Sequence, residues 1–249
     1  MTQDYISIDL ETTGLQPKTE KIIEIGAWKV ENGEITDSFS SFVNPGRKLT
    51  ERITELTGIK DEDLRDAPYI EEVLPGLLNF MGDMPILGHS VMFDYTFLKK
   101  AAVNQRFSFE KKGIDTLMIA RKYLPELEHR SLDYLCGYFQ IPHRAHRASE
   151  DARATHILYR KLAELFYEKE CTEKPSEGNL FMPRQLVITV KKEFPATIQQ
   201  KKLLYRLIHR HKIDVNADIE RLSRSEASRL ENRIRSGQFG PLSPPDDEE

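Results

Sequence analysis

The sequence predicts a mixed-sheet α/β domain followed by a small, mostly helical C-terminal module. Strand patterns come first along the chain and then alternate with helical patterns, which is the order expected of a sheet covered by helices. A change to a basic composition after about residue 183 indicates a second, smaller unit. The chain has 249 residues, of which 39% are hydrophobic and 31% charged. It is therefore long enough for one full domain with an appendage.

The first three expected strands form an antiparallel meander. Residues 5–9 alternate inward and outward side chains, and residues 22–30 end near an Asn-Gly pair, a strong hairpin signal. Residues 35–43 supply the returning strand, which an Asn-Pro-Gly sequence terminates. This meander predicts three neighbouring strands at one side of the sheet.

The remainder of the first domain alternates between helical and strand patterns. Apolar residues at helical spacing, or short apolar runs, define these elements. We expect helices over 50–56, 69–81, 94–103, 131–139 and 149–168, and strands over 85–89 and 112–116. The result is a five-stranded mixed sheet flanked by helices, in a domain covering residues 1–169.

The rest of the chain divides into three parts. Residues 170–178 are rich in Glu, Lys, Thr, Pro and Ser, which predicts a linker over 170–183, and residues 241–249 predict an acidic tail. Residues 184–240 contain two capping-box patterns and predict a small helical module. Residues 184–236 hold 13 Lys and Arg against 6 Asp and Glu, although the whole chain has a net charge of −4. Such a basic module binds nucleic acid, contacts protein or simply faces solvent, and the sequence leaves these open.

The composition excludes several classes of protein. No run of about 18 apolar residues occurs, and the first residues lack the basic and apolar segments of a secretory signal. We therefore expect a cytoplasmic protein without a membrane partner. The two cysteines, Cys136 and Cys171, show no spacing typical of a disulfide framework or a zinc site.

Two carboxylates at the end of the first strand carry the first chemical signal. Asp9 and Glu11 are two residues apart, so the period of a strand places both on one face. Adjacent carboxylates repel each other unless a cation neutralises them. The pair is therefore a candidate site for a hard, oxygen-seeking cation such as Mg²⁺ or Mn²⁺, or else two exposed strand-end charges.

Two further motifs add to this signal. A Gly-His-x-x-x-Phe-Asp motif occupies residues 88–94, and a His-x-x-x-x-Asp-Ala motif occupies residues 146–152. Together with the Asp-x-Glu-Thr-Thr-Gly-Leu sequence at 9–15 and the Ile-Ile-Glu-Ile-Gly strand at 22–26, they resemble the DnaQ-like family of 3′-to-5′ exonucleases, in its DEDDh subgroup. The resemblance covers about residues 4–167, and three ordered motifs are far more specific than any one alone.

The resemblance implies an RNase H-like fold and an active site with two divalent cations, Mg²⁺ or Mn²⁺. It implies that four acidic residues together bind the two ions and that His146 is the general base. The acidic residues are Asp9, Glu11, Asp94 and Asp151. This agrees with the chemistry of phosphodiester hydrolysis, because two ions can activate a water and stabilise the leaving oxygen. A histidine with a pKa near 6.5 can accept the proton of that water at neutral pH.

The resemblance also implies a set of substrate-binding residues. They are Thr12, Thr13, Leu15, His89 and Phe93. Backbone beside Thr12 would hold the terminal 3′-hydroxyl, Leu15 would wedge against the terminal bases, and the other two would line the cleft. Alternatively, His89 is a structural histidine, and Leu15 and Phe93 belong to the hydrophobic core. One departure from the family is Ser90, where many members have Asn.

The expected activity is metal-dependent 3′-to-5′ hydrolysis of DNA that releases nucleoside monophosphates. The family includes exonuclease subunits and domains that proofread for bacterial replicative polymerases. Single-stranded or frayed DNA 3′ ends are the expected substrate, and a DNA polymerase or another replication or repair protein is a candidate partner. Two alternatives stay open, namely RNA 3′ trimming, as by RNase T or oligoribonuclease, and a non-catalytic adaptor for nucleic acid or a polymerase.

Overall fold

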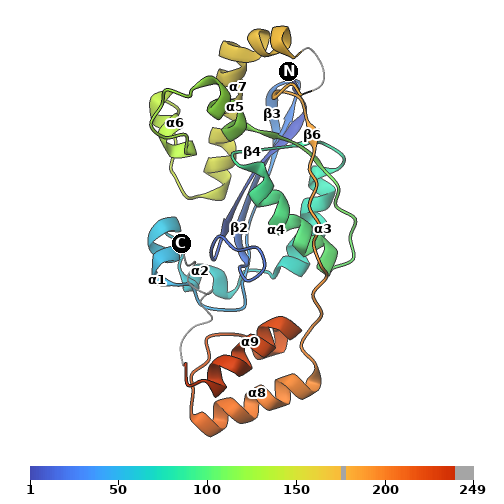
Figure 1. Ribbon diagram of the computed structural model, residues 1–249, viewed down its shortest axis with the longest axis vertical. Coiled ribbons are helices and arrows are strands. Elements are labelled where there is room, and N and C mark those ends of the chain that lie inside the picture. The colour runs from blue at the N-terminus through green and yellow to red at the C-terminus, as the bar shows by residue number, and fades with distance from the viewer. Residues whose placement is uncertain (175–177, 239–249) are drawn as a thin grey trace.

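The computed structural model describes residues 1–174 and 178–238, and it contains one mixed β-sheet covered on both faces by helices (Figure 1). The sheet has the strand order β3-β2-β1-β4-β5-β6. Its strands are β1 (Tyr5–Thr12), β2 (Ile22–Glu31), β3 (Glu34–Phe42), β4 (Ile86–Gly88), β5 (Lys112–Asp115) and β6 (Arg184–Gln185). The α/β class with a mixed sheet is thus confirmed.

The sheet has six strands in the described part of the chain, not the five that the sequence predicted. The first three strands form the expected antiparallel meander, and β4 and β5 add to β1 in parallel. The sixth strand, β6, pairs antiparallel with β5 through Lys112 and Gly113. A two-residue strand carries too little periodicity to be found in a sequence, which explains the missed edge strand.

Seven helices accompany the sheet in residues 1–174, and five of them cover its two faces. The seven helices are α1 (Glu51–Thr57), α2 (Asp61–Arg65), α3 (Ile70–Met81), α4 (Val91–Asn104), α5 (Thr116–Tyr123), α6 (Leu132–Tyr138) and α7 (Ala148–Glu173). Helices α3 and α4 pack on Ile6, Ile8 and Leu10 of β1 and form one apolar core. Helices α5, α6 and α7 pack on the opposite face, where Tyr5 and Val30 contribute to the second core. The odd and even residues of β1 therefore point to different helical layers.

The segment expected to be a linker is partly packed against this domain. Helix α7 continues to Glu173, five residues beyond the expected end, and Phe181 is fully buried in the second core. Residues 175–177 lie outside the described part of the chain. After β6, Leu186 is buried in the first core, so the chain leaves the first domain only beyond this point.

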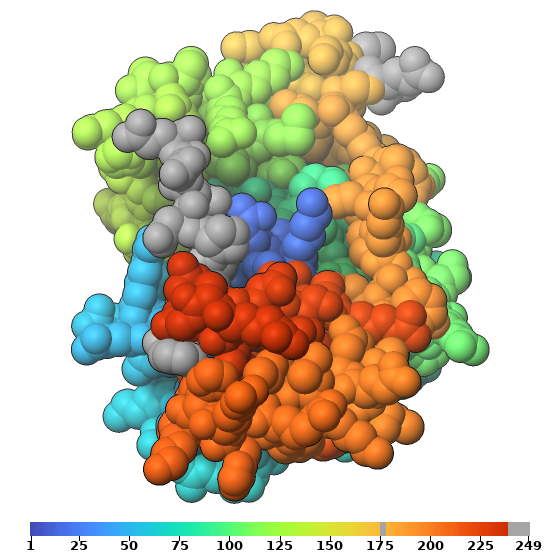
Figure 2. Space-filling model, turned by 60° about the horizontal axis from the view of Figure 1, so that its bottom comes forward, coloured from blue at the N-terminus to red at the C-terminus, as the bar shows by residue number. Residues whose placement is uncertain are grey.

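The C-terminal module has a small apolar core of its own. The module consists of α8 (Ile198–His211), the short 3-10 helix η1 (Ile219–Arg221) and α9 (Arg224–Arg235). Both helices begin with the predicted capping boxes, Thr197 with Gln200 and Ser223 with Glu226. Figure 2 shows α8 and α9, in orange and red, forming one end of the molecule. The predicted acidic tail lies outside the described residues.

None of the helices in residues 1–174 and 178–238 combines the length and the apolar character needed to span a membrane.

Candidate active site

The expected catalytic carboxylates of β1 face helix α7. Along β1, the Tyr5 hydroxyl lies 2.9 Å from His156 Nδ1 of α7, and the Ser7 hydroxyl donates to the carbonyl of Ala152 at 2.6 Å. Since alternate residues share one face of a strand, Asp9 and Glu11 continue this row toward the beginning of α7. The predicted placement of both carboxylates on one face therefore agrees with the strand geometry.

The beginning of α7 approaches β2 closely because of two residues of that strand. Gly26 is opposite Asp9 in the register, and a Cβ atom added to it would lie 2.2 Å from the backbone of Ala148. Glu24 is opposite Glu11, accepts a hydrogen bond from the Ala148 amide at 3.1 Å and pairs with Arg147 at 2.9 Å. A glycine that admits the helix and a carboxylate that caps it thus fix the first turn of α7 beside β1.

The two residues of the third motif are held in one local structure. His146 precedes α7 with a φ of 63°, a left-handed conformation that is uncommon for residues other than glycine. Its backbone amide donates to Asp151 Oδ2 at 3.0 Å, and Asp151 lies in the first turn of α7. This bond stabilises the turn that directs the imidazole toward the end of β1.

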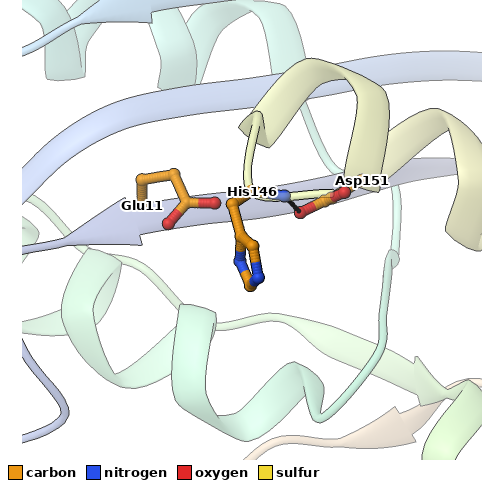
Figure 3. Close-up of side chains that lie close together, drawn as sticks. All are labelled: Glu11, His146 and Asp151. Atoms are coloured by element: carbon orange, nitrogen blue, oxygen red, sulfur yellow. Dashed lines mark hydrogen bonds between the residues drawn. The ribbon is translucent and has the colours of Figure 1, made fainter. Parts of the chain in front are cut away.

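Glu11 lies beside His146 and Asp151, although these two residues come much later in the sequence (Figure 3). One ligand atom from each residue lies within 4.8 Å of the others. Glu11 and Asp151 are buried, with 8% and 7% of their surface exposed. His146 is only partly buried, so the cluster opens to solvent on the imidazole side.

Asp94 reaches the same strand from the other helical layer. Its carboxylate accepts a hydrogen bond from the backbone amide of Leu10 at 3.2 Å, and it is 3% exposed. The neighbouring strand β4 pairs with β1 only at Ile6 and Ser7, so the Leu10 amide lies beyond that ladder. Asp94, in the first turn of α4, takes the place of the missing backbone partner.

The carboxylates of the cluster raise one another's pKa values. Burial raises the pKa of Asp9 well above its usual range, and the neighbouring charges of Asp94, Asp151 and Glu11 raise it further. Burial, followed by the charges of Asp151 and Glu24, raises the pKa of Glu11 to about 8, despite the opposing effect of nearby Arg147. Four acidic groups therefore share one partly desolvated place.

The donor set fits divalent cations that prefer oxygen ligands. Asp9, Glu11, Asp94 and Asp151 supply carboxylate oxygens only, the ligand type of Mg²⁺ and Mn²⁺. Burial raises the pKa of Asp9, Asp94 and Asp151, and neighbouring carboxylates raise that of Asp9 and Asp94 further. A positive charge beside these groups stabilises their charged form. The residues present can thus hold such a cation.

His143 is an additional neighbour of the cluster that the sequence motifs did not indicate. Its Nε2 atom hydrogen-bonds Asp151 Oδ1, and its Nδ1 atom lies 3.6 Å from Asp133. Burial raises the pKa of Asp151, while the hydrogen bond and charge of His143 oppose this effect. The repeated His-Arg-Ala sequence at 143–148 was the available signal, but a repeat does not show which histidine faces a carboxylate.

The end of β1 and the loop after it carry three predicted substrate residues, two of which are held by hydrogen bonds. Thr12 donates to the carbonyl of Gly14 at 2.8 Å, and Thr13 donates to Glu20 while accepting from Arg47. Leu15, in contrast, is 75% exposed at the tip of the loop and therefore does not belong to the core. Its exposure is compatible with the predicted contact to a terminal base.

His89 and Phe93 have well-defined partners within the protein. The His89 Nε2 atom lies 2.8 Å from the carbonyl of Arg130, and its Nδ1 atom lies 2.8 Å from the hydroxyl of Thr116. Since only a donor can bond a carbonyl, Nε2 carries the proton and Nδ1 accepts. Both nitrogens are engaged, as in the structural role that the sequence left open. The ring of Phe93 packs on Phe97 with centroids 5.0 Å apart, so substrate contact by either residue stays a prediction.

The backbone conformation of Ser90 explains why many family members have Asn at this position. Its φ of 76° lies in the left-handed region, and its amide donates to Asp115 Oδ1 at 3.0 Å. Asn tolerates this conformation better than Ser, which gives a physical reason for the Asn found in many family members.

Comparisons with known proteins show the family to which the chain belongs. Residues 6–159 match the model of the exonuclease family named after RNase T, so the chain belongs to that family. It is 36% identical over 230 residues to the PolC-type DNA polymerase III of Oceanobacillus iheyensis, and 35% identical over 238 residues to that of Thermotoga maritima. These matches cover 89% and 92% of this chain but only 16% and 17% of the relatives.

Solved structures of exonucleases share the fold. Exonuclease X in complex with 5′ overhanging duplex DNA matches with a TM-score of 0.51 and 24% identity, covering 64% of this chain and 91% of that chain. Escherichia coli exonuclease I in complex with a dA16 oligonucleotide matches with a TM-score of 0.58 and 19% identity, covering 68% and 42%. The predicted RNase H-like fold, and the resemblance to DnaQ-like exonucleases, are confirmed.

Proposed function

We propose that the protein is a metal-dependent 3′-to-5′ exonuclease that releases nucleoside monophosphates from DNA. The observation that carries this proposal is the convergence of Glu11, His146 and Asp151 within 4.8 Å at the end of β1, beside Asp9 and Asp94. Membership of the exonuclease family supports it independently. A protein that only bound nucleic acid would have no need for four partly desolvated carboxylates beside a histidine.

In this mechanism the protein residues position the reacting groups and move a proton. His146 accepts the proton of the attacking water, and its partly exposed imidazole then passes the proton to solvent. The hydrogen bond from its backbone amide to Asp151 keeps the imidazole beside the carboxylates. Thr12, Thr13 and Leu15 hold the terminal nucleotide, so the scissile phosphate is presented in one orientation.

Asp9, Glu11, Asp94 and Asp151 would hold the two divalent cations. When bound, such ions make a water molecule more acidic and neutralise the charge that develops on the phosphate and the leaving oxygen. The carboxylates stay charged under these conditions because the positive charge offsets their mutual repulsion.

DNA 3′ ends are the proposed substrate, single-stranded or frayed. The similarity to PolC-type DNA polymerase III relatives supports a role in replication, such as proofreading, or in repair. The chain spans about a sixth of the length of those relatives. We propose that it acts either alone or together with a DNA polymerase. The cytoplasmic location stays a prediction.

The test is hydrolysis of 5′-labelled single-stranded DNA and RNA of the same sequence, in Mg²⁺, in Mn²⁺ and in EDTA. We expect a ladder that shortens from the 3′ end of DNA in the presence of either metal and no cleavage in EDTA. Asp9→Ala should lower the rate of hydrolysis by more than about 10²-fold. The reason is that even residues that only hydrogen-bond to metal ligands contribute about 10–100-fold to metal affinity or activity.

The contrary outcomes are equally specific. Faster shortening of RNA than of DNA would assign the chain to RNA trimming. Cleavage of neither polymer, with retained binding, would assign it an adaptor role, and substantial activity of Asp9→Ala would place the reaction elsewhere.

A further inference from the structure

The C-terminal module contacts the catalytic domain mainly through polar groups. Its apolar core is a separate cluster around Leu204, Leu207 and Leu230, distinct from the cores of the sheet. Between the two units lies a groove of about 450 Å³, lined by Lys21, Lys100 and other residues of both. Polar contacts beside this groove join the module to the first domain.

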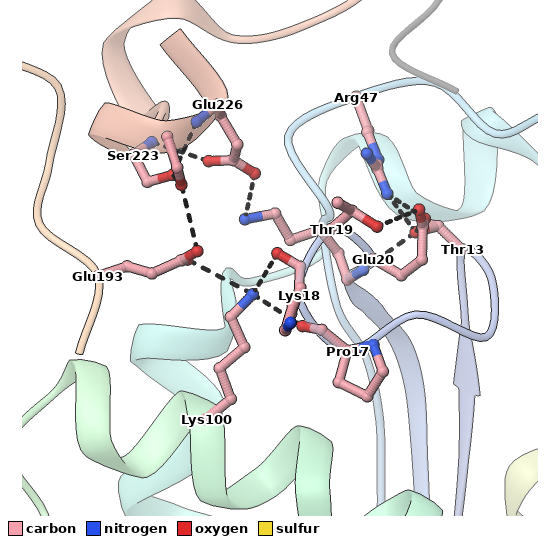
Figure 4. Close-up of polar contacts among 12 residues, drawn as sticks. Thr13, Pro17, Lys18, Thr19, Glu20, Arg47, Lys100, Glu193, Ser223 and Glu226 are labelled. Atoms are coloured by element: carbon pink, nitrogen blue, oxygen red, sulfur yellow. Dashed lines mark hydrogen bonds and ion pairs between the residues drawn. The ribbon is translucent and has the colours of Figure 1, made fainter. Parts of the chain in front are cut away.

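One of these contacts joins α9 to the residue that closes the loop after β1. Glu226 Oε1 pairs with Lys21 Nζ at 2.8 Å. Figure 4 shows Glu226 beside Ser223, whose amide donates to Glu226 Oε2 at 2.8 Å in the capping box. The Glu226 side chain is only 9% exposed. Burial alone would raise the pKa of Glu226, but the charge and hydrogen bond of Lys21 and the bonds to Ser223 lower it to about 2.

The backbone of Lys21 leads directly to Thr13. The Thr13 amide donates to the Lys21 carbonyl at 2.9 Å, and the Lys21 amide donates to the Thr13 hydroxyl at 3.0 Å. Lys21 therefore holds the base of the loop with its backbone and the module with its side chain. A single residue connects α9 to the predicted substrate-binding threonine.

A second path reaches the same threonine from another part of the module. The Asp218 amide donates to the Gly46 carbonyl at 2.9 Å, and the Lys48 amide donates to Asn216 Oδ1 at 2.9 Å. These two bonds flank Arg47, whose guanidinium donates to Thr13 and pairs with Glu20. Two independent sets of contacts thus converge on Thr13.

A third contact holds the outer part of the loop. Lys100 of α4 donates to the carbonyls of Pro17 and Lys18 at 2.8 and 3.0 Å. The same ammonium group lies 3.4 Å from Glu193, which precedes α8 and also accepts from Ser225 at 3.3 Å. The chain leading into the module therefore shares this lysine with the loop.

We infer that the C-terminal module is a positioning element for the DNA 3′ end, which it serves by fixing the loop of residues 13–21 through Lys21, Lys100 and Arg47. This inference rests on the proposed exonuclease function. It assigns the module a role in binding the terminal nucleotide without direct contact to it. Lys21, Lys100 and Arg47 are positioning residues, because they act on the terminal nucleotide only through the loop.

The decisive variant is Glu226→Gln in the full-length chain. Gln also serves at the N3 position of a capping box, three residues after the N-cap, as Gln200 does at the beginning of α8. The change therefore removes the charge opposite Lys21 while it preserves the start of α9. The matched control is Glu231→Gln, the same change in the same helix, where Glu231 pairs at 2.8 Å with Arg235 of the module itself.

Two measurements are needed, both well below the melting temperature. Hydrogen exchange of the amides in residues 13–21 should become faster in Glu226→Gln and remain unchanged in Glu231→Gln. For single-stranded DNA, Glu226→Gln should raise KM about three- to tenfold with little change in kcat, as expected when binding and not chemistry is weakened. Lys21→Gln should reproduce both effects, and the double variant with Glu226→Gln should show no larger effect than either single variant. Lys21→Arg, which keeps the positive charge, should have wild-type exchange and a wild-type KM.

The possible results separate this inference from the proposed function. Unchanged exchange in the loop overturns the inference, and so does faster exchange with an unchanged KM. A drop in kcat equal to the drop in kcat/KM also overturns it, since the module would then serve the chemical step. If the wild-type chain hydrolyses no polymer, the proposed function fails, while the exchange measurement still decides whether the module fixes the loop.

Discussion

Acidic residues occur in two contrasting settings, at the end of β1 and at the boundary with the C-terminal module. Around Glu11 the carboxylates face one another, and burial with their mutual charge raises its pKa to about 8. Glu226 is equally buried, yet its pKa is lowered to about 2 because the Lys21 charge and hydrogen bonds outweigh desolvation. Burial raises the pKa in both places, so the neighbouring charges account for the opposite outcomes.

This difference separates a site prepared for a ligand from a finished structural contact. The Glu226 carboxylate has its cation within the protein, and both of its oxygens are engaged. The carboxylates of Glu11 and Asp9 have mainly acidic neighbours, so an external cation improves their environment most. The two settings should therefore respond differently to mutation, to metal ions and to pH.

The largest expected effect is on catalysis at the β1 cluster. His146→Ala should slow DNA hydrolysis by about 10²–10⁴-fold, the usual contribution of a general base. The measurement is single-turnover cleavage as a function of pH, with folding checked by circular dichroism. Glu226→Gln should leave this chemical rate nearly unchanged. An unaltered rate in His146→Ala would transfer the role of the base to another group, with His143 as the nearest candidate.

Divalent cations should stabilise the fold through the β1 cluster alone. At a free Mn²⁺ concentration 100 times the dissociation constant, the expected gain in unfolding free energy is about 2.7 kcal/mol. At a fixed Mn²⁺ concentration the gain should increase from pH 6 to pH 8.5, because the raised pKa of Glu11 means that protons compete with the ion below about pH 8. Thermal melting with Mn²⁺ or EDTA tests this. Glu226→Gln should keep the full metal effect and Asp9→Ala should lose it; equal stabilisation of both would argue against this site.

The smallest expected effect is the pH-dependent contribution of Glu226 to stability. Its folded pKa of about 2 is below the unfolded value, so the stabilisation is present above about pH 4.5 and is lost as the pH falls toward 2. Because Lys21 is one-third exposed, we expect about 1–3 kcal/mol rather than the full linkage energy. Denaturant unfolding of wild type and Glu226→Gln from pH 7 to pH 2 should show this difference shrinking. A constant difference over this range would mean that the ion pair is not its cause.

Most of the fold could be predicted because its elements carry strong local patterns. The meander of β1, β2 and β3, the long helices and both capping boxes follow from periodicity and turn residues. The edge strand β6 could not be predicted, since two residues have no period of their own. Phe181 is similar, because the apolar run at 180–182 is too short to show that its ring packs beside Tyr159 and Tyr167.

The candidate site could be predicted as a set of residues but not as an arrangement. Motif spacing indicated the carboxylates and the histidine. The roles of Glu24 and Gly26 depend on contacts with the beginning of α7, more than a hundred residues later in the sequence. The role of His143 depends on the direction of its side chain. The predicted roles of Thr12, Leu15, His89 and Phe93 depend on a bound substrate and stay predictions.

The sequence alone determined the α/β class, the order of most elements, the family, and which side chains bring acidic and basic chemistry to the site. These properties depend on residue types and short-range spacing, which a linear chain records directly. Only the tertiary structure decided which carboxylates crowd together at β1, and that Glu226 joins Lys21 across the boundary of the module. The effect of a charge depends on its distance to other charges and to water, and folding sets those distances.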